Sequence, residues 1–282
     1  MISFNLETKL RHLLNTWWPA VNTPGCHVTL VQGLTAASWR IDLDDQIVLV
    51  RTQTVEKSVL GISRKREARL LRRSGKGLGP QVLAQSNHWI IVEWLIGQCA
   101  TNKGLNALNQ CGALAEMVAG LHRSPLSGYR LNLQKQLASY WYQLDKRRLT
   151  PAWLGYQQHF LRTTPPTPLK IAPLHMDIHP GNLVISTTGL RLIDWEYATD
   201  GDVALDIAVL FRNNDWTSDQ QDCFLQHYTQ HGYPAASQLH AQVQHWLPWV
   251  DYLMLMWFEA RWHQSKQAEF LHLGKFLRQR FC

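Results

Sequence analysis

The hydrophobic pattern of the first hundred residues predicts a small antiparallel sheet accompanied by helices. Runs of alternating or β-branched residues are separated by turn residues, as expected of short strands. The predicted strands cover residues 27–32, 38–43, 46–52, 81–84 and 89–94. Leucines at helical spacing predict a helix between Leu6 and Trp17, and a second helix is predicted from about Ser63 to Arg73, before the break at Ser74-Gly75.

Beyond Leu105 the pattern becomes mainly helical. Leu108, Ala115, Val118 and Leu121 at helical spacing predict one helix. The other predicted elements are a helix at 133–144, a hairpin of 183–186 and 190–195, and several tryptophan-rich helices within 203–282. Strands first and helices afterwards predict an α+β chain, with a small antiparallel-sheet lobe and a larger, mainly helical lobe.

Composition narrows the class of protein. The 282 residues are 45% hydrophobic and 17% charged, which excludes a disordered chain. The apolar stretch Trp246–Phe258 is too short to span a bilayer and contains Asp251, and the N-terminal residues, with Glu7, lack the apolar core of a secretory signal. We therefore expect neither a membrane span nor export.

The cysteines indicate the cellular compartment of the protein, and the net charge indicates the class of its partners. Five cysteines without a CxxC pair argue against a disulfide framework or structural zinc, and scattered free thiols suit a cytoplasmic location. The 13 histidines contain no HExxH motif, so no metal site built by the protein alone is expected. The net charge of +7 favours an anionic partner, either a nucleic acid or a nucleotide.

The strongest chemical signal is the pair of segments Leu174–Asn182 (LHMDIHPGN) and Leu192–Glu196 (LIDWE). Asp177 and Asn182 are five residues apart, and Asp194 follows twelve residues later, across the predicted hairpin. Phosphoryl transfer needs a carboxylate beside the attacking hydroxyl and oxygen ligands for magnesium, and one loop plus one returning strand can supply both. The spacing matches the H-x-D-x-x-x-x-N catalytic loop of kinases and their strand-end metal aspartate. The plain alternative is an ordinary surface loop and hairpin.

Four weaker features agree with a kinase. Gly33–Ser38 lies between two predicted strands, where kinases cover the nucleotide phosphates, although it is also compatible with a plain hairpin turn. Arg51 ends a strand, at the position of the phosphate-pairing lysine. Glu67 shares a helix face with leucines, so it should point inward and pair with Arg51, while the basic residues around it should form a solvated outer face. The backbone of Glu93–Leu95 could bind adenine.

These motifs resemble the aminoglycoside phosphotransferase and choline kinase superfamily, which shares the protein-kinase fold. The likeness is carried by residues 174–208, by Arg51 in place of lysine, by the segment VEWLIGQ from Val92 and by WFEARW from Trp257. Within the superfamily the chain is most similar to the bacterial thiamine kinases. The resemblance implies a nucleotide-covering lobe at 1–92, a hinge at 93–98 and a catalytic and substrate-binding lobe at 99–282.

The resemblance also implies roles for individual residues. Asp177 would accept the proton of the substrate hydroxyl, and His179 would approach the γ-phosphate. Asn182 and Asp194 would hold Mg²⁺ on the phosphates of ATP. His175 would brace the loop, and Asp206 would anchor it from a neighbouring helix. ATP would be held by Gly33, Ser38, Arg51, Glu67, Glu93 and Leu95.

Two segments depart from the superfamily pattern. The phosphate-covering loop has Ala36 and Ala37 where related enzymes have glycines, which restricts its backbone. Choline kinases place a glutamate about seven residues after the position of Asp206, where this chain has Arg212–Asp215. The second departure argues against choline as the substrate.

The tryptophans of the last third suggest how a cationic alcohol could be bound. An aromatic face over a cation contributes roughly 0.5–2 kcal/mol, and a thiazolium ring offers both a charge and a flat surface. Trp257, Glu259 and Trp262 are the candidate substrate residues, although tryptophans of such a segment can equally fill the helical core.

The predicted function is therefore ATP-dependent phosphorylation of the hydroxyl of thiamine, by a monomer that uses ATP and Mg²⁺ and binds neither nucleic acid nor membrane. Three alternatives stay open. The first is a choline, ethanolamine or aminoglycoside kinase. The second is a nucleotide-binding pseudokinase, suggested by the glycine-poor loop. The third is nucleic-acid binding through the basic helix 63–73.

Overall fold

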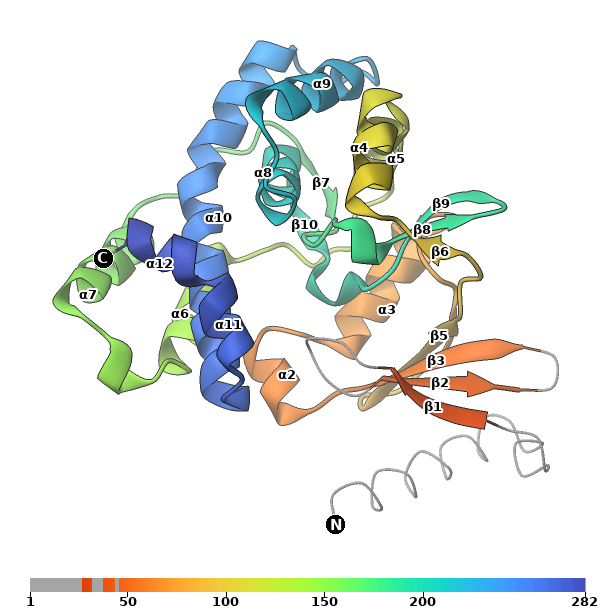
Figure 1. Cartoon of the computed structure of the whole chain (residues 1–282), viewed down its shortest axis with the longest axis horizontal. Coiled ribbons are helices and arrows are strands. Elements are labelled where there is room, and N and C mark those ends of the chain that lie inside the picture. Colours follow the sequence, from red (N-terminus) through yellow and green to blue (C-terminus); the bar gives the residue numbers. More distant parts are fainter. Residues whose placement is uncertain (1–26, 32–37, 44–45, 282) are drawn as a thin grey trace.

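The structure is a computed structural model that describes residues 27–31, 38–43 and 46–281. The predicted helix between Leu6 and Trp17 and the candidate residue Gly33 lie outside the described residues. A sheet-rich part and a larger helical part lie side by side (Figure 1). The predicted α+β class and two-lobe arrangement are confirmed.

One five-stranded antiparallel sheet forms the small part. Its strands are β1 (His27–Val31), β2 (Ser38–Asp42), β3 (Ile47–Thr52), β4 (Val82–Gln85) and β5 (Trp89–Glu93), in the order β1-β2-β3-β5-β4. Each of the five strands begins and ends within one residue of its predicted position. Side chains alternate between the faces of a strand. Val48 and Val50 therefore pack on one face with Ile41 and Ile91, whereas Arg51 points to the other.

Two helices follow β3. They are α2 (Val55–Val59) and α3 (Arg64–Arg73), and α3 begins as predicted, because the Ser63 side chain caps it by accepting the Arg66 N–H. Helix α3 packs against β4 and β5. Residues 94–97 then connect β5 to β6 (Gln98–Cys99) in the helical part. The predicted hinge at 93–98, with lobes at 1–92 and 99–282, stays a prediction.

The helix predicted around Leu108–Leu121 is in fact two helices. They are α4 (Asn102–Gln110) and α5 (Ala113–Arg123), separated at Gly112. Gly112 has φ = +80°, and a Cβ atom there would lie 2.9 Å from the His227 ring. With its left-handed backbone, Gly112 turns the chain between the two helices. The hydrophobic spacing that predicted a single helix therefore extends over both of them. Helices α6 (Leu133–Tyr142) and α7 (Pro151–Arg162) follow.

Four strands carry the loops of the helical part. Strand β7 (Ile171–Leu174) pairs with β10 (Thr199–Asp202), and the predicted hairpin β8 (Leu183–Ser186) and β9 (Gly189–Leu192) adds to β6. The sequence did not reveal β10, because its residues are Thr-Asp-Gly-Asp. Asp200 is nevertheless buried, since its carboxylate accepts the backbone N–H groups of Ser127 and Gly128.

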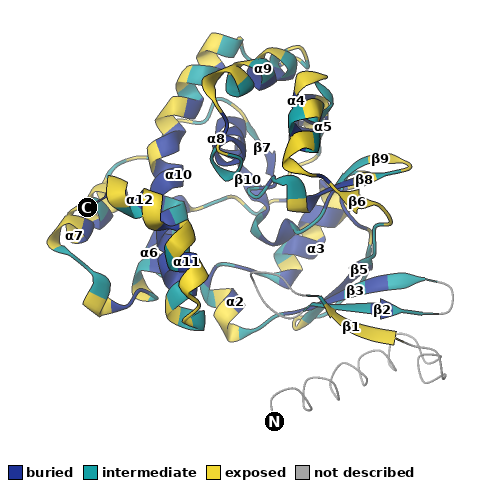
Figure 2. Cartoon of the chain, in the orientation of Figure 1, coloured by how far each residue is buried: buried dark blue, intermediate teal, exposed yellow. Residues whose placement is uncertain are grey.

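The remaining helices enclose these loops. They are α8 (Val203–Asn213), α9 (Ser218–Thr229), α10 (Ala236–Ser265), α11 (Ala268–Leu273) and α12 (Lys275–Arg280). Helix α8 packs along α10 and is almost wholly buried, whereas α11 and α12 expose one side (Figure 2). Among the described residues, no helix has the length and apolar character needed to cross a bilayer.

Candidate active site

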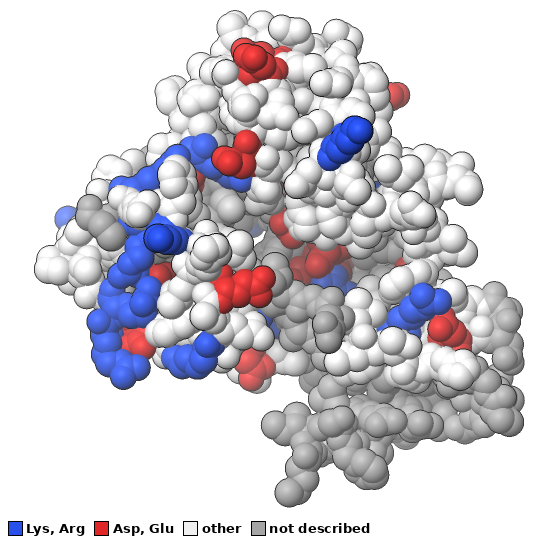
Figure 3. Space-filling view, viewed as in Figure 1, with Lys and Arg blue, Asp and Glu red and all other residues white. Residues whose placement is uncertain are grey.

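A cleft of about 740 Å³ separates the sheet-rich part from the helical part. Strand β3, helix α3 and residues 93–97 line one wall, and the loops after β7 and β9 line the other, with α10 at one end. Acidic side chains gather at the bottom of this hollow beside a basic one (Figure 3). The cleft brings together most of the candidate residues.

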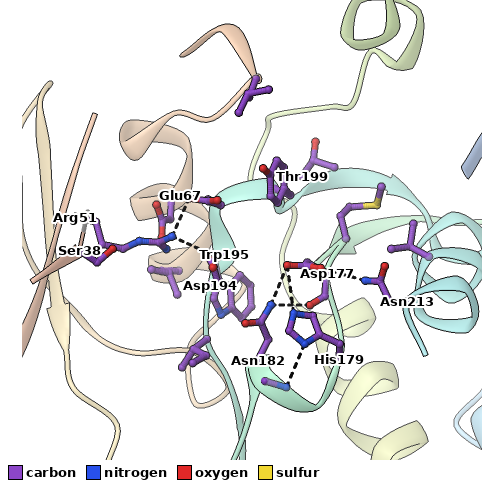
Figure 4. A pocket seen from close by; sticks show the side chains of 18 of the residues that line it. Ser38, Arg51, Glu67, Asp177, His179, Asn182, Asp194, Trp195, Thr199 and Asn213 are labelled. Carbon is purple, nitrogen blue, oxygen red and sulfur yellow. Dashed lines mark hydrogen bonds and ion pairs between the residues drawn. The ribbon is translucent and has the colours of Figure 1, made fainter. Parts of the chain in front are cut away.

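Asp177 follows β7 and is held by two amides. Asn182 Nδ2 donates to its Oδ2 at 2.9 Å, and Asn213 Nδ2 donates to its Oδ1 at 3.1 Å (Figure 4). Burial raises the pKa of Asp177 to about 7, and the nearby charges of Asp194 and Glu196 act in the same direction. A carboxylate with such a pKa is suited to accept a proton near neutral pH. Asn213 was missed from sequence, because it lies 36 residues away on α8.

Asp206, in α8, supports the loop that carries Asp177. Its Oδ1 accepts the Met176 N–H at 2.6 Å, and its Oδ2 accepts the His175 N–H at 3.1 Å. Met176 is thereby held in the left-handed region, with φ = +67°, which is strained for a residue with a side chain. His122 completes the buried group through its Nε2, 3.1 Å from Asp206 Oδ2. These contacts are those expected for His175 and Asp206.

Asn182 and Asp194 present oxygen atoms to the cleft. The Asn182 amide donates through Nδ2 to the carbonyl and carboxylate of Asp177, so its Oδ1 stays available as an acceptor. In the described part of the chain, neither this Oδ1 nor Asp194 Oδ2 accepts a hydrogen bond. Amide and carboxylate oxygens are the ligands that Mg²⁺ prefers, so the donor set fits that ion. Asp194 has φ = +62°, a second strained residue at the site.

Arg51 connects the sheet to the side of the cleft that carries Asp194. Its Nη1 lies 2.6 Å from Glu67 Oε1, and its Nη2 lies 2.6 Å from Asp194 Oδ1 and 2.8 Å from Glu196 Oε2. Burial opposes the charge, but these carboxylates outweigh it and hold the pKa of Arg51 well above its usual range. The predicted inward direction of Glu67 and its pairing with Arg51 are confirmed.

The ion-pair cluster is larger than the sequence indicated. Arg64 is fully buried and pairs with both Glu67 and Glu196, and Arg66 lines the cleft. The prediction of a solvated basic face is therefore wrong for these two residues, although Lys65, Arg69 and Arg72 are exposed. The available signal was the spacing Arg64–Glu67 (i, i+3), which lets a helix pair the two side chains.

Glu196 was missed as a site residue although it lies two residues after Asp194. Its side chain is fully buried, and its Oε1 has no hydrogen-bond partner among the described residues. Burial and the charge of Asp194 raise the pKa of Glu196, while Arg51 and Arg64 counteract them. Glu196 thus shares its second oxygen between two arginines, while its first oxygen is buried without a hydrogen-bond partner among the described residues.

Three further candidate nucleotide residues, Ser38, Glu93 and Leu95, also line the cleft, and Ser38 pairs with Arg51 across strands β2 and β3. The Glu93 and Trp94 N–H groups are already bonded within the sheet, but the Leu95 N–H donates no hydrogen bond to any described residue. Next to it, a Cβ on Gly97 would come within 2.5 Å of the Ile185 carbonyl, so only glycine fits there. The Leu95 N–H is therefore available to donate a hydrogen bond to a ligand in the cleft.

His179 lies in the same loop as Asp177, two residues after it. Its Nδ1 accepts the Gly181 N–H at 3.1 Å, and its Nε2 lies 3.7 Å from Asp177 Oδ2. Burial lowers the pKa of His179, and the charge of Asp194 partly offsets this effect. The side chain is one-third exposed and lines the cleft, so it is free to meet a ligand.

Of the three candidate substrate residues, Trp257, Glu259 and Trp262, only Trp257 lines the cleft. Its indole N–H donates to the Tyr197 hydroxyl at 2.8 Å. Glu259 instead accepts two hydrogen bonds from Arg148 and one from Arg278, and Trp262 lies between Arg148 and Lys266. Residues two and five positions after Trp257 occupy other sides of a helix with 3.6 residues per turn. The structure therefore does not bring Glu259 and Trp262 to the cleft.

The Asp177 loop, the free oxygens of Asn182 and Asp194 and the ion pair to an inward glutamate define a phosphotransferase of the protein-kinase-like type. The chain belongs to the phosphotransferase enzyme family, whose model matches residues 33–271. Among its relatives, the thiamine kinase of Escherichia coli O17:K52:H18 is 35% identical over 246 residues, covering 87% of this chain and 86% of that protein. The thiamine kinase of Salmonella paratyphi A is 36% identical over 253 residues, covering 88% and 87%.

Solved structures agree on the fold. The choline kinase LicA from Streptococcus pneumoniae superposes with a TM-score of 0.77 over 98% of both chains, at 16% identity. LicA in complex with AMP superposes with a TM-score of 0.73 over 95% of this chain and 96% of that one, at 15% identity. These likenesses are structural, because at such identities only the fold is shared.

Proposed function

We propose that this protein is a thiamine kinase that transfers the γ-phosphoryl group of ATP to the hydroxyl of thiamine, giving thiamine monophosphate. The observation that carries the proposal is the convergence of Asp177, Asn182 and Asp194 on one cleft that ends at an aromatic wall. The relatives at about 35% identity over most of the chain, named thiamine kinases, favour thiamine over other alcohols. The complex of LicA with AMP favours an adenine nucleotide.

Asp177 is the residue that orients the substrate alcohol. Its carboxylate is held from both sides by Asn182 and Asn213, so it presents a fixed acceptor to the hydroxyl proton. As the oxygen attacks the γ-phosphorus, the proton moves toward Asp177. Positioning of this kind accounts for most of the catalysis in phosphoryl transfer, because the transition state needs little covalent help.

Cations balance the negative charge of the ATP phosphates. Mg²⁺, when bound with ATP, neutralises the charge that develops on the bridging and terminal phosphate oxygens. Asn182 Oδ1 and the Asp194 carboxylate would hold it. Arg51, fixed between Glu67 and Glu196, brings a permanent cation to the same place. His179 Nε2 lies 3.7 Å from Asp177 Oδ2, so it would contact the γ-phosphate that reacts beside Asp177.

The apolar end of the cleft suits the thiazolium ring. Trp257, Met254 and Phe258 of α10 line it together with Met176 and Leu131. Aromatic faces attract a delocalised cation, and polarizable thioethers pack against flat rings. A hydroxyethyl arm on such a ring can reach Asp177.

Purified protein incubated with ATP, Mg²⁺ and thiamine tests the proposal, with thiamine monophosphate and ADP measured by mass spectrometry. We expect stoichiometric formation of both products. Choline, ethanolamine and an aminoglycoside serve as competing alcohols under the same conditions. Faster turnover of any of these than of thiamine would contradict the substrate, and ATP binding without transfer to any alcohol would favour a pseudokinase.

A matched pair of carboxylate variants ties activity to the site. Asp177→Asn should lower kcat by about 10³-fold or more while the protein stays folded, since the acceptor of the proton is lost. Asp219→Asn removes an exposed carboxylate on α9, outside the cleft, and should leave kcat unchanged. Equal activity of the two variants would contradict the role of Asp177.

A further inference from the structure

The cleft continues past the catalytic carboxylate to a second group of polar residues, which we call the distal subsite. It consists of Gly61, Arg66, Gln136, Tyr140 and Tyr197. These residues come from both sides of the cleft, since Gly61 and Arg66 belong to the segment of α2 and α3, and Gln136 and Tyr140 belong to α6. The catalytic steps described above use none of them.

Arg66 brings unused hydrogen-bond donors to this subsite. Among the described residues, the only acceptor of its guanidinium is the Glu196 carbonyl, 3.0 Å from Nη2. Its Nε is buried and has no partner. A guanidinium has five N–H groups, and only one of those of Arg66 has an acceptor among the described residues, although the side chain lines the cleft. Unpaired donors in a partly buried place are costly, which favours a ligand acceptor for the terminal N–H groups of Arg66.

Gln136 brings a fixed acceptor next to it. Its Nε2 donates to the Leu60 carbonyl at 3.1 Å, and this bond assigns the amide and leaves Oε1 as an acceptor without a partner in the described part of the protein. The Tyr140 hydroxyl donates to the same carbonyl at 3.2 Å. Gly61 has φ = +81°, and a Cβ there would lie 2.2 Å from Gln136 Oε1, so glycine makes room for the amide.

Tyr140 interacts with both Arg66 and Gln136. Its hydroxyl and Gln136 Nε2 donate to the same Leu60 carbonyl. Burial raises the pKa of the Tyr140 phenol well above its usual range, and the charge of Arg66 and a hydrogen bond with Gln136 partly offset the effect. The distal subsite thus contains a donor, Arg66, and an acceptor, Gln136, that line the same cleft and interact with the same phenol.

The distal subsite contains no acidic side chain. The acidic residues that line the cleft are Glu67, Glu93, Asp177, Asp194 and Glu196. Two of them, Glu67 and Glu196, are bound by Arg51 and Arg64. A cationic group at the distal subsite would meet the charge of Arg66, and the neighbouring carboxylate, Glu196, is already paired with Arg51 and Arg64, so burial of a cation there is unfavourable. The distal end of the substrate should therefore be neutral.

We propose that the distal subsite recognises a neutral nitrogen heterocycle that carries an amino group beside a ring nitrogen. Arg66 donates to the ring nitrogen, and Gln136 Oε1 accepts from the amino group. The inference rests on the proposed function, because the aminopyrimidine of thiamine has this edge and is joined to the cationic ring that carries the alcohol. The substrate then lies with its hydroxyl at Asp177, its thiazolium at Trp257 and its pyrimidine at Arg66 and Gln136.

Three alcohols separate this recognition from catalysis. They are thiamine, oxythiamine, in which an oxo group replaces the amino group, and an N-methyl thiazolium alcohol that lacks the pyrimidine. For the wild type we expect kcat/KM to fall by about 10²-fold for either analogue, because each leaves polar groups of the distal subsite unpaired. Comparable kcat/KM for thiamine and the truncated alcohol would overturn the proposal while leaving thiamine kinase activity intact.

Variants assign the effect to the two residues. Arg66→Met and Gln136→Leu should each lower kcat/KM for thiamine by about 10-fold or more and leave that for the truncated alcohol nearly unchanged. Lys65→Met removes the same charge from an exposed neighbour on α3 and should change neither value. Arg66→Lys, which keeps a donor, should recover part of the loss. Equal losses for both alcohols would mean that Arg66 only supports Glu196, and the proposal would be wrong.

Failure of the proposed function is recognised separately. A wild type that phosphorylates none of the three alcohols contradicts thiamine kinase activity. Calorimetric binding of thiamine then decides the inference. Binding that is lost in Arg66→Met and kept in Lys65→Met supports the distal subsite, whereas unchanged binding in Arg66→Met, or no binding to the wild type, overturns it.

Discussion

Arg51 Nη2 lies 2.6 Å from Asp194 Oδ1, so a single guanidinium links strand β3 to the residue that would hold Mg²⁺. The same group contacts Glu67 and Glu196, which are buried in the α3 side and the β9 side of the cleft. Arg51 therefore neutralises buried carboxylates in the folded protein, and under the proposed function it would have a second task, to provide a cation for the nucleotide phosphates.

The first task predicts a loss of stability on removal of the charge. Arg51→Met should lower the free energy of unfolding by about 3–5 kcal/mol, because Glu67 and Glu196 would stay buried with fewer cations. The double variant Arg51→Met with Glu196→Gln should recover part of this loss, since one of the uncompensated charges is removed. Urea unfolding measures both values. A stability of Arg51→Met equal to that of the wild type would contradict this account of the cluster.

The raised pKa of Asp177 predicts a pH-dependent stability. The folded protein holds the Asp177 proton up to about pH 7, whereas the unfolded chain releases it near pH 4. Stability of the wild type should therefore fall, relative to Asp177→Asn, as the pH rises from about 4 to 7. Without nucleotide and Mg²⁺, we expect Asp177→Asn to be more stable by about 1–3 kcal/mol at pH 8, and similar to the wild type at pH 4.

Urea unfolding of both proteins at several pH values gives this difference. The matched variant Asp219→Asn, on the surface of α9, should follow the wild type at each pH. A difference between wild type and Asp177→Asn that does not change with pH would show that burial does not raise the pKa of Asp177 in the folded protein.

The strained backbone at Met176 predicts a positioning role for Asp206. Asp206→Ala removes the acceptor of the Met176 and His175 N–H groups, so the loop can leave the left-handed conformation and shift Asp177. A misplacement of about 1 Å can cost about 10² in rate, and we expect such a fall in kcat with a change in the KM for ATP below about threefold. Asp206→Asn keeps one oxygen acceptor and should lose less. Unchanged kcat in Asp206→Ala would refute this role.

Trp257 and Trp262 form a matched pair on one helix. Trp257→Leu should raise the KM for thiamine by about 10-fold and leave the KM for ATP unchanged, since a cation–aromatic contact of about 1–2 kcal/mol is lost at the substrate end. Trp262→Leu should change neither value, because Trp262 lies between Arg148 and Lys266 outside the cleft. Steady-state kinetics with thiamine and ATP measures both KM values for each variant. A raised KM for thiamine in Trp262→Leu and an unchanged one in Trp257→Leu would show that Trp262, not Trp257, contacts the substrate.

Much of the catalytic centre could be predicted because its parts are close in sequence. Asp177 and Asn182 share one short loop, and Asp194 returns by a hairpin whose length fixes where it ends. The five strands of the sheet were also predictable, since alternation of side chains is a local property. Strand β10 and the break at Gly112 were not, because polar strands and left-handed glycines become meaningful only through their partners.

The sequence by itself predicted Asp177, Asn182 and Asp194 as the residues of the proposed chemistry, and it determined the small sheet beside them, because local spacing and periodicity encode both. The tertiary structure alone decided that Glu259 is bound by arginines outside the cleft and that Arg66 and Gln136 both line it. Arg148 and Glu259, like Arg66 and Gln136, are 70 or more residues apart in the sequence, and the free energy of burying a charge depends on what the rest of the chain packs around it.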